Sequence, residues 1–405
     1  MSAKTIDKRN QLLAGVRVID ISSSIAAPTA TMYLGDLGAD VIKIERPGTG
    51  DDARAWGPPF VGGQAPWFAS ANRNKRSVCL DLRKPEGREV LFRLLADADV
   101  FVQNLTPGKL AKLDLDPASV RARFPGLIYC ALSGFGLDGP SQDEPGYDLI
   151  AQARGGLMSV TGAAGGPPQR VSTALSDIVA GMIATFTISA ALHRKARTGE
   201  GELIDVSLLE ASLALLGPRV ASFLAGEPEP QPSGATDSVI AIYQPFETAD
   251  HSIVVAVGND AMWLRFCAAL ELPQLAADAG LATNEGRRGR RDELIGVLTE
   301  QFRTASAETW LARLREAKVP CAPVQFLSEV LDDPQIRARG AVIATGHPGA
   351  EPIQTLGSPW RLGSDGGETP HRPAPLLGAS THEVLSEAGY HDDDIAKLIE
   401  EEVAM

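Results

Sequence analysis

One aspartate stands where an ionised carboxylate could act as a nucleophile. Ser176 and Asp177 lie between a loop of small residues, Thr161 to Thr173, and a long apolar segment that begins at Ile178. We expect Asp177 to cap the helix formed by that segment, because an Asp side chain accepts hydrogen bonds from the free N–H groups of a helix start. The helix dipole favours the ionised carboxylate by roughly 0.3 to 1 kcal/mol. Position alone leaves both an ordinary capping role and a catalytic role open.

Basic residues are concentrated in the first quarter of the chain. Residues 71–84 carry a net charge of +4, and Lys43, Arg46 and Lys112 follow neighbouring predicted elements. If these elements form one sheet, several cations meet at one edge, where they suit a ligand with more than one phosphate. Charge alone leaves a solvated basic surface as the alternative. The basic residues of the 71–84 segment are Arg73, Lys75, Arg76, Arg83 and Lys84.

A glycine motif follows one of the predicted strands. Gly134, Gly136 and Gly139 satisfy the G-x-G-x-x-G spacing of dinucleotide-binding proteins. Pro140 follows at once, and no helix is expected to begin at the third glycine, as that motif requires. We interpret the segment as a turn that lines a pocket, because glycine lets ligand or backbone approach closely. A dinucleotide-binding oxidoreductase remains an alternative.

Cysteine and histidine usage predicts no metal centre. The four cysteines form no C-x-x-C pair, and no two of the six histidines have metal-ligand spacing. We therefore expect reduced, mostly structural thiols. His391 is followed by three aspartates, which we interpret as the first turn of a final helix.

Alternating strands and helices must position these side chains. Apolar runs at Val16 to Ile21 and Asp40 to Glu45 flank a helical segment, Ala26 to Leu37. The alternation predicts an α/β fold with a mostly parallel sheet covered on both faces and ligands at the carboxyl ends of the strands. It continues through Ser77 to Leu82 (strand), Pro85 to Ala98 (helix), Val100 to Val102 (strand), Pro117 to Phe124 (helix) and Leu127 to Leu132 (strand).

The second half of the chain predicts a further, smaller domain. Residues 1–224 are expected to form the first part of a large domain, which closes with a long helix from about Ile178 to Arg197, a strand and another helix. Residues 225–238 have the Pro- and Gly-rich composition of a stiff linker. Residues 239–340 are expected to form a small α+β domain that starts with a hairpin. Residues 341–405 then form a linker and return to the large domain.

Composition narrows the class of protein. A chain of 405 residues allows two or three domains, and a net charge of −13 argues against nucleic acid or an anionic membrane as the main partner. The apolar run from Ile178 to Leu192 has 15 residues, which we expect to be too short to span a bilayer. Met1 to Asn10 contain no apolar segment of the kind that directs secretion, so we expect a cytoplasmic protein.

Six segments form an ordered set of motifs between Leu13 and the carboxyl end. The set resembles the class III CoA-transferase family, also called the CaiB/BaiF family, and is closest in pattern to its succinyl-CoA:glutarate branch. The resemblance implies a Rossmann-like large domain built from both chain ends, a small domain between them, and an interlocked homodimer. The segments are Leu13-Ala-Gly-Val-Arg-Val-Ile-Asp20, Leu37-Gly-Ala-Asp-Val-Ile-Lys-Ile-Glu-Arg-Pro-Gly48, Asn74-Lys-Arg-Ser77, Ser133-Gly-Phe-Gly-Leu-Asp-Gly-Pro140, Thr198-Gly-Glu-Gly201 and Pro375-Leu-Leu-Gly378.

The resemblance assigns covalent chemistry to Asp177. In such enzymes one aspartate at the start of a long helix attacks an acyl-CoA thioester, and Asp177 in Ala174-Leu-Ser-Asp177 is the matching residue. An aspartyl anhydride and then an aspartyl-CoA thioester would form, and a second carboxylic acid would reverse the sequence. This route divides one difficult exchange into easier steps. Coenzyme A is then a substrate carrier, and no tightly bound cofactor or metal is implied.

The resemblance also implies a set of CoA contacts. Tyr147 would line the thioester pocket, and the small residues after the first strand would allow close approach of the pantetheine arm. Some relatives have glutamine where this chain has Ile25, and the long glycine-rich loop of formyl-CoA transferases is missing, which argues against oxalate as the acid. The implied contacts are Ile25, Ala26, Arg46, Lys75, Asn104, Leu105 and Lys112.

Two questions remain open at the level of sequence. The family includes α-methylacyl-CoA racemases, which need a histidine in the segment matching Gly146-Tyr147-Asp148, and an ordinary phenol with a pKa of about 10 is a poor base at neutral pH. CoA transfer is therefore favoured over racemisation, and a non-catalytic CoA-binding module is a further alternative. The run Ile242 to Phe246 suggests a dicarboxylic acid acceptor. Arg170 could pair with its distal carboxylate, although a structural role is equally open.

Overall fold

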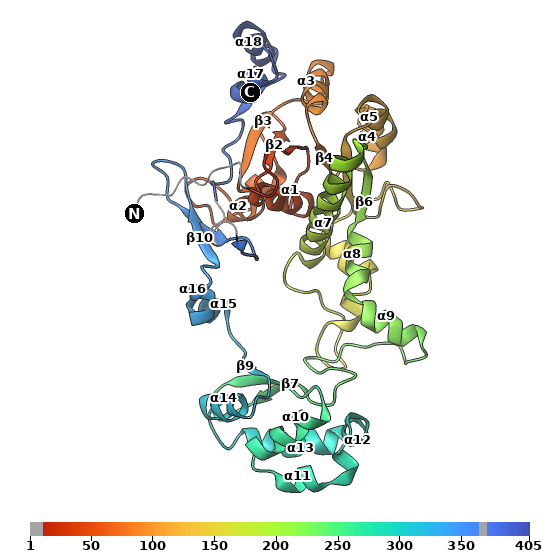
Figure 1. Ribbon diagram of the computed structural model, residues 1–405, viewed down its shortest axis with the longest axis vertical. Coiled ribbons are helices and arrows are strands. Elements are labelled where there is room, and N and C mark those ends of the chain that lie inside the picture. Colours follow the sequence, from red (N-terminus) through yellow and green to blue (C-terminus); the bar gives the residue numbers. More distant parts are fainter. Residues whose placement is uncertain (1–10, 364–370) are drawn as a thin grey trace. The chain divides into compact units, whose positions relative to one another are not determined.

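The computed structural model describes residues 11–363 and 371–405. Met1 to Asn10, on which the expectation about secretion rests, and residues 364–370 of the second Pro- and Gly-rich stretch lie outside the described residues. The chain divides into two compact units (Figure 1). The large unit contains the described residues of Met1–Leu157, Arg170–Ala225 and Gln335–Met405, and the small unit contains Met158–Gln169 and Gly226–Pro334.

A six-stranded sheet forms the centre of the large unit. Its strand order is β3-β2-β1-β4-β5-β6 and every neighbouring pair is parallel, as the alternating pattern predicted. The order reverses between β1 and β4, and in doubly wound folds ligands bind beside that switch point. The strands are β1 (Arg17–Asp20), β2 (Asp40–Glu45), β3 (Lys75–Cys79), β4 (Val100–Gln103), β5 (Ile128–Ser133) and β6 (Leu203–Ser207).

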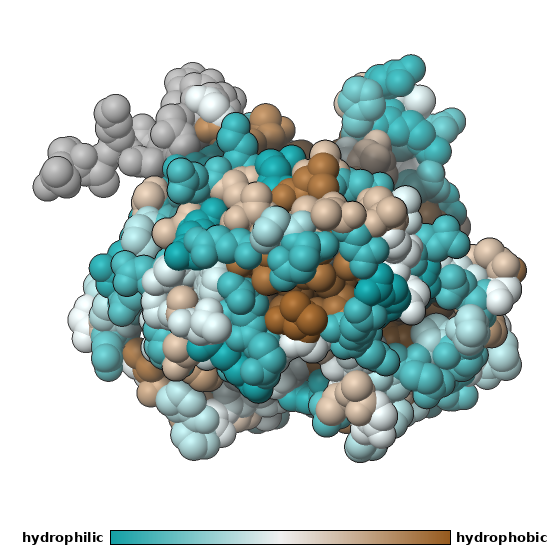
Figure 2. All heavy atoms as spheres, turned by 90° about the horizontal axis from the view of Figure 1, so that it is seen from below, coloured by the Kyte–Doolittle hydropathy of each residue, from teal (hydrophilic) through white to brown (hydrophobic). Residues whose placement is uncertain are grey.

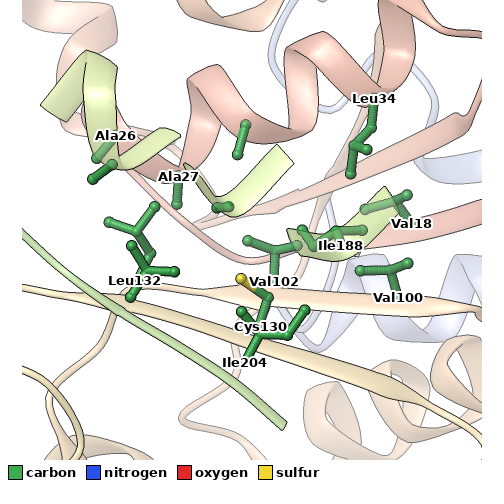
Figure 3. Close-up of a cluster of buried hydrophobic side chains, with 14 of the residues drawn as sticks. Val18, Ala26, Ala27, Leu34, Val100, Val102, Cys130, Leu132, Ile188 and Ile204 are labelled. Atoms are coloured by element: carbon green, nitrogen blue, oxygen red, sulfur yellow. The ribbon is translucent and has the colours of Figure 1, made fainter. Parts of the chain in front are cut away.

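Both faces of this sheet are buried under helices. Successive side chains of a strand point to opposite faces, so Val18 and Ile19 belong to different hydrophobic clusters. One cluster packs the sheet against α1 (Ala26–Asp36) and α7 (Leu175–Thr198), and Figure 3 shows Leu34 and Ile188 of these helices facing the strand residues. The opposite cluster contains α3 (Pro85–Ala96), α5 (Pro117–Arg123), α17 (Thr381–Glu387) and α18 (Asp392–Glu400).

The remaining helices of the large unit are short. The sequence pattern predicted neither α2 nor α4, although each begins with a proline at its first position, where the missing N–H costs nothing. They are α2 (Pro66–Asn72), α4 (Pro107–Lys112), α6 (Asp148–Arg154), α8 (Leu208–Leu215) and α9 (Gly217–Leu224).

The carboxyl-terminal segment attaches to the edge of the sheet at β3. The backbone N–H of Cys79 donates to Thr381 Oγ1 at 3.1 Å, and that of Asp81 donates to the carbonyl of Val403 at 2.8 Å. The segment first passes through α16 (Pro334–Ala338) and the antiparallel pair β10 (Val342–Thr345) and β11 (Ile353–Leu356). Both chain ends therefore contribute to the large unit.

The small unit combines a three-stranded sheet with helices. The predicted hairpin is confirmed as the antiparallel pair β7 (Tyr243–Glu247) and β8 (Ser252–Ala256), and β9 (Cys321–Pro323) pairs with β8. Trp263 and Trp310 are almost completely buried in its core. Its helices are α10 (Asp260–Ala269), α11 (Pro273–Ala277), α12 (Asn284–Gly289), α13 (Arg291–Phe302), α14 (Ala307–Glu316) and α15 (Leu327–Asp332).

Helix α7 is longer than the sequence predicted. It has 24 residues and begins at Leu175, three residues before the expected start. Among the described residues, α7 is the one helix that is long and apolar enough to cross a membrane. We expected the apolar run to be too short for a span, but the length of the helix does not exclude one. A core helix meets the same criterion, and here Ala180, Ala184 and Ile188 have no exposed surface.

Candidate active site

Asp177 lies in the first turn of α7 and does not cap it. Ala174 occupies the capping position and makes no side-chain cap, and Asp177 is the third residue of the helix. The prediction that Asp177 is the cap was therefore wrong, because the helix starts earlier than the apolar run. The half-buried carboxylate remains beside the positive end of the helix dipole.

The cap of α7 comes from another helix. Asp148, the first residue of α6, is buried, and its Oδ1 accepts hydrogen bonds from the backbone N–H groups of Ser176 at 2.8 Å and Asp177 at 3.4 Å. Its Oδ2 accepts a hydrogen bond of 2.7 Å from Gln152 Nε2. Ser176 is held from a third helix by Ser212 of α8, whose hydroxyl donates to Ser176 Oγ at 2.7 Å. Helices α6 and α8 thus fix the first turn of α7.

Close backbone contacts position these helices. A Cβ on Gly181, one turn after Asp177, would lie 2.6 Å from the carbonyl oxygen of Ala26, so glycine lets α7 approach the start of α1. A Cβ on Gly134 would lie 2.7 Å from the Cα of Gly146. The glycine motif therefore closes a turn that leads into α6. No helix begins within it, which removes the structural basis for the dinucleotide alternative.

Burial and a second carboxylate weaken the acidity of Asp177. Burial from water raises the pKa of Asp177 to about 7, and the negative charge of Asp148 adds to the effect. At neutral pH the carboxylate is therefore present in both protonation states. A more basic carboxylate is a stronger nucleophile once ionised, and the half-buried Asp177 keeps part of its surface accessible.

A pocket of about 1070 Å³ opens at the carboxyl ends of β1, β2, β3 and β4. It lies beside the switch point, where the connections that leave β1 and β4 run to opposite halves of the sheet. The loop Ile21 to Ser23 lines it and leads directly into α1, whose first residue contacts Gly181. Its basic lining residues are Arg46, Arg83, Lys84 and Lys109, and its acidic ones are Glu45, Asp51, Asp52, Asp81 and Glu402.

The predicted CoA contacts fall in different places. Arg46 and Leu105 line this pocket. Asn104 ties the two diverging loops together, since its amide donates to the carbonyl of Ser23 at 2.8 Å and accepts from the Ser23 N–H at 3.1 Å. Lys112 is exposed at the end of α4 and does not line the pocket.

Two further predicted contacts lie at the start of α1. Ile25 and Ala26 are only 6% and 5% exposed, and their side chains do not line the pocket. Their backbone lies at the start of α1, which has no side-chain cap, so the two residues could contact a ligand through backbone groups. Tyr147 is 60% exposed and immediately precedes Asp148. Arg170 is also exposed, and the next residue, Val171, donates its N–H to Gln152 Oε1 at 2.9 Å.

Lys75 does not present its ammonium group to a phosphate. The side chain is completely buried, and Nζ donates to Asp20 Oδ2 at 3.1 Å, to the carbonyl of Pro28 at 2.9 Å and to Asn72 Oδ1 at 2.9 Å. These three bonds use all its hydrogens. In this structure Lys75 joins β3 to β1 and α1, so its place as a direct CoA contact is corrected to a structural one.

Three cations that were not predicted as CoA contacts line the pocket. Arg83 and Lys84 belong to the basic run at residues 71–84, and both line the pocket, as does Lys109 one turn before Lys112. Arg83 is held by Asp81 at 2.7 Å, and Lys84 donates to the carbonyl of Glu401 at 2.5 Å. The overall charge of the run was visible in the sequence, but its division between core and surface was not.

A doubly wound sheet, a pocket at its switch point with four basic side chains in its lining, and a carboxylate at the start of α7 define an α/β enzyme that could bind a phosphorylated carrier and react covalently with its cargo. The chain belongs to CoA-transferase family III, whose model matches residues 13–381. It is an enzyme of this class, as the sequence motifs predicted.

Curated relatives share most of their length with this chain. It is 39% identical to succinyl-CoA:glutarate CoA-transferase of Homo sapiens, over 94% of this chain and 87% of that protein. It is 37% identical to succinate--glutarate CoA-transferase of Agrobacterium fabrum, over 94% and 96%. Succinyl-CoA:mesaconate CoA-transferase of Haloarcula hispanica is also 37% identical, over 93% and 96%.

Solved structures agree with the fold. A CaiB/BaiF family protein from Brucella suis superimposes with a TM-score of 0.80 at 35% identity, covering 94% of this chain and all of that one. A protein from Mycobacterium tuberculosis superimposes with a TM-score of 0.81 at 28% identity, covering 92% and 98%. The predicted family and the parallel α/β sheet are therefore confirmed.

Proposed function

We propose that this CoA-transferase moves coenzyme A reversibly from succinyl-CoA to a second dicarboxylic acid, with Asp177 as the nucleophile. The observation that carries the proposal is a half-buried carboxylate with a pKa of about 7, on a turn of α7 that α6 and α8 fix in place. The names of the relatives from Homo sapiens, Agrobacterium fabrum and Haloarcula hispanica support succinyl-CoA as the donor and a dicarboxylate as the acceptor.

In the first half-reaction, an oxygen of Asp177 attacks the thioester carbonyl of the acyl-CoA. A C–O bond forms, the C–S bond breaks, and the CoA thiolate leaves an aspartyl anhydride behind. The thiolate then attacks the Asp177 carbonyl carbon, and the donor acid leaves as a carboxylate. The acceptor carboxylate attacks the resulting aspartyl-CoA thioester, and the same steps run in reverse. Asp177 ends as it began, with no net proton or electron change.

The cations of this pocket would hold the phosphates of CoA. Lys109 and Arg46 are exposed cations at its lining, and charge-assisted bonds to phosphate are among the stronger ones proteins make. The pantetheine arm would pass the backbone of Ile25 and Ala26, where the pocket loop enters α1. Because Gly181 seats α7 against Ala26, this path leads toward the first turn that carries Asp177. Lys112 and Leu105 would contact the carrier from the β4 side.

Arg170 is our candidate for the distal carboxylate of the acceptor. It is exposed, and Gln152 holds the adjacent Val171, so the loop has a fixed attachment to α6. A guanidinium binds a carboxylate through two parallel hydrogen bonds, which suits discrimination of a dicarboxylate from a monocarboxylate. Tyr147 would line the thioester pocket.

The proposal is tested by an acceptor screen. Incubation with succinyl-CoA and glutarate, mesaconate or acetate should give new CoA esters, with the dicarboxylates favoured. Asp177→Ala should lower the rate by at least about a thousandfold, because the covalent route is removed. Hydroxylamine should trap an acyl group at residue 177 in the native enzyme only. An unchanged rate in Asp177→Ala would refute the mechanism.

We also propose that two subunits form an interlocked homodimer. Phe186 of α7 is 60% exposed, and Phe326 and Leu327 at α15 are 79% and 82% exposed in the single chain, which fits surfaces covered by a partner. One face of the molecule also shows hydrophobic surface bordered by hydrophilic residues (Figure 2). Light scattering should give twice the chain mass, and tagged and untagged dimers should exchange subunits only after unfolding.

A further inference from the structure

The cap of α7 is the part of the site that the proposed chemistry does not use. Asp148 does not need to contact substrate in that scheme. It is nevertheless buried, and both of its oxygens accept hydrogen bonds close to the nucleophile. Its Oδ1 receives the N–H groups of Ser176 and of Asp177 itself, and its Oδ2 receives Gln152. A buried carboxylate placed against another carboxylate is costly, so its presence calls for a reason.

Gln152 extends this contact to the loop before α7. It lies one turn after Asp148 on α6, so the two side chains share a face. Its Oε1 accepts the N–H of Val171, and its Nε2 also donates to the carbonyl of Thr173 at 3.2 Å. Asp148 and Gln152 therefore bind both the loop after Arg170 and the helix turn that carries Asp177.

We propose that Asp148, oriented by Gln152, is a positioning residue that fixes the first turn of α7 and the backbone of the nucleophile Asp177. The proposal rests on the proposed function, since it concerns the same nucleophile. Asp148 takes the N–H of Asp177 and that of Ser176, which lie at the helix start and would otherwise stabilise a negative charge there. Asp177 is left with fewer hydrogen-bond donors and with a like charge nearby. Both effects stabilise its ionised carboxylate less, which makes that carboxylate more reactive.

Few charged groups lie on the other elements around Asp177; the exposed Arg170 lies in the loop before α7, and the exposed Tyr147 immediately precedes Asp148. The first turn of α1 contains no acidic residue, and the titratable residues of that helix, Tyr33 and Asp36, lie in its last turn. On α8 the one ionisable residue is Glu210, which accepts a bond from Ser207. On α6 the other ionisable group is Arg154, which pairs with Glu144 at 2.8 Å. The remaining ionisable residues of α7 are in its last two turns: His193, Arg194, Lys195 and Arg197.

The test compares Asp148→Asn with the native enzyme and with Asp116→Asn. Asp116 caps α5 through the N–H of Ser119 at 3.0 Å, so its variant removes a capping carboxylate from a helix without a site residue. We would measure kcat/KM for succinyl-CoA from pH 5 to 9, because this profile reports the ionisation of the free enzyme. Thermal unfolding of each variant would report its stability.

For Asp148→Asn, the acid limb of the profile should move roughly half to one pH unit lower, because a like charge is lost. The plateau should fall roughly tenfold or more, since the carboxylate is less basic and less well placed. Asp148→Glu should restore part of the plateau and the native limb. Asp116→Asn should lower stability and leave the profile unchanged.

A variant Asp148→Asn that is less stable but has the native pH profile would overturn the positioning role. If that variant does not fold, Gln152→Leu provides the same test, because it frees Asp148 from its partner while keeping the charge, and should lower the plateau without moving the limb downward. Loss of exchange in Asp177→Ala alongside an unmoved limb would refute only this inference. Persistence of exchange in Asp177→Ala would refute the function itself.

Discussion

Two carboxylates of the large unit are treated in opposite ways. Asp20, at the end of β1, has no exposed surface and receives hydrogen bonds from Ser22, Thr31 and Lys75. Burial alone would raise its pKa, but Lys75 and Lys43 lower it below the ordinary value. Asp177 is more exposed, yet its pKa is raised to about 7, because burial is joined there by the charge of Asp148.

The difference separates a structural carboxylate from a reactive one. Asp20 Oδ1 accepts from the hydroxyl and N–H of Ser22, and Oδ2 accepts from the Thr31 hydroxyl and the Lys75 ammonium, so the carboxylate is held ionised with both oxygens occupied. Its partner Lys43 also pairs with Asp51 at 2.9 Å, which extends the cluster to the floor of the pocket. The backbone of Asp177 is held rigidly, and none of the described residues forms an ion pair with its carboxylate, so the fold loses some stability and keeps a basic oxygen available.

The largest effect we predict is on stability, from removing the structural carboxylate. Asp20→Asn should lower the free energy of unfolding by about 3 to 5 kcal/mol, because breaking a buried ion pair leaves Lys75 without its counter-charge. Urea denaturation followed by circular dichroism measures this loss. Asp52→Asn is the matched control: its carboxylate is 54% exposed and pairs with Arg46, so it should cost at most about 1 kcal/mol. Equal losses would show that the Asp20 cluster does not carry the stability we assign to it.

Much of the sheet could be predicted because its signal is local. Apolar runs alternating with amphipathic helices gave six strands, with β2 matching to the residue and β3 displaced by two. The start of α7 was displaced by three residues because its cap comes from Asp148, 28 positions before the Ser176 N–H that it accepts. The residue pattern of α7 does not reveal this cap. The place of Asp148 depends on the close approach of Gly134 and Gly146, which closes the loop between them just before α6.

The candidate site shows the same limit. Asp177 could be identified from its motif, but the raised pKa depends on a tertiary neighbour. The basic run at residues 71–84 could be identified from charge, yet Lys75 is internal and Lys84 lines the pocket. Within β3, Lys75 is buried and its neighbour Arg76 is partly exposed, because successive strand residues face opposite sides and the register against β2 fixes the partners of each. That register is a property of the folded sheet.

The next prediction compares a cation bound in the core with one that remains free. Lys109→Ala should raise KM for succinyl-CoA about fivefold to tenfold and leave the melting temperature unchanged, because Lys109 is exposed at the pocket and has no ion pair among the described residues. The effect should shrink at high ionic strength, since exposed charges are screened. Lys75→Met should instead lower the melting temperature. A larger rise of KM in Lys75→Met, at native stability, would restore Lys75 as a direct CoA contact.

The smallest effect is a gain of stability from neutralising the reactive carboxylate. Since the pKa of Asp177 is raised from 3.8 to about 7 on folding, the native state binds more protons than the unfolded state between these values. The contribution of Asp177 to stability therefore falls as pH rises through this range. Asp177→Asn mimics the protonated acid, so at pH 8 it should raise the melting temperature by roughly 2 to 4 °C, equivalent to about 1 kcal/mol.

At pH 5 the gain from Asp177→Asn should be smaller, because the native carboxylate is then already protonated. Differential scanning calorimetry at the two pH values measures this difference. Asp116→Asn gives the opposite sign at pH 8, because its hydrogen bonds to Ser119 lower the pKa of Asp116 and favour the ionised form. A gain that is equal at both pH values would mean that Asp177 is destabilising through its shape, and the contrast with Asp20 would then no longer be one of charge.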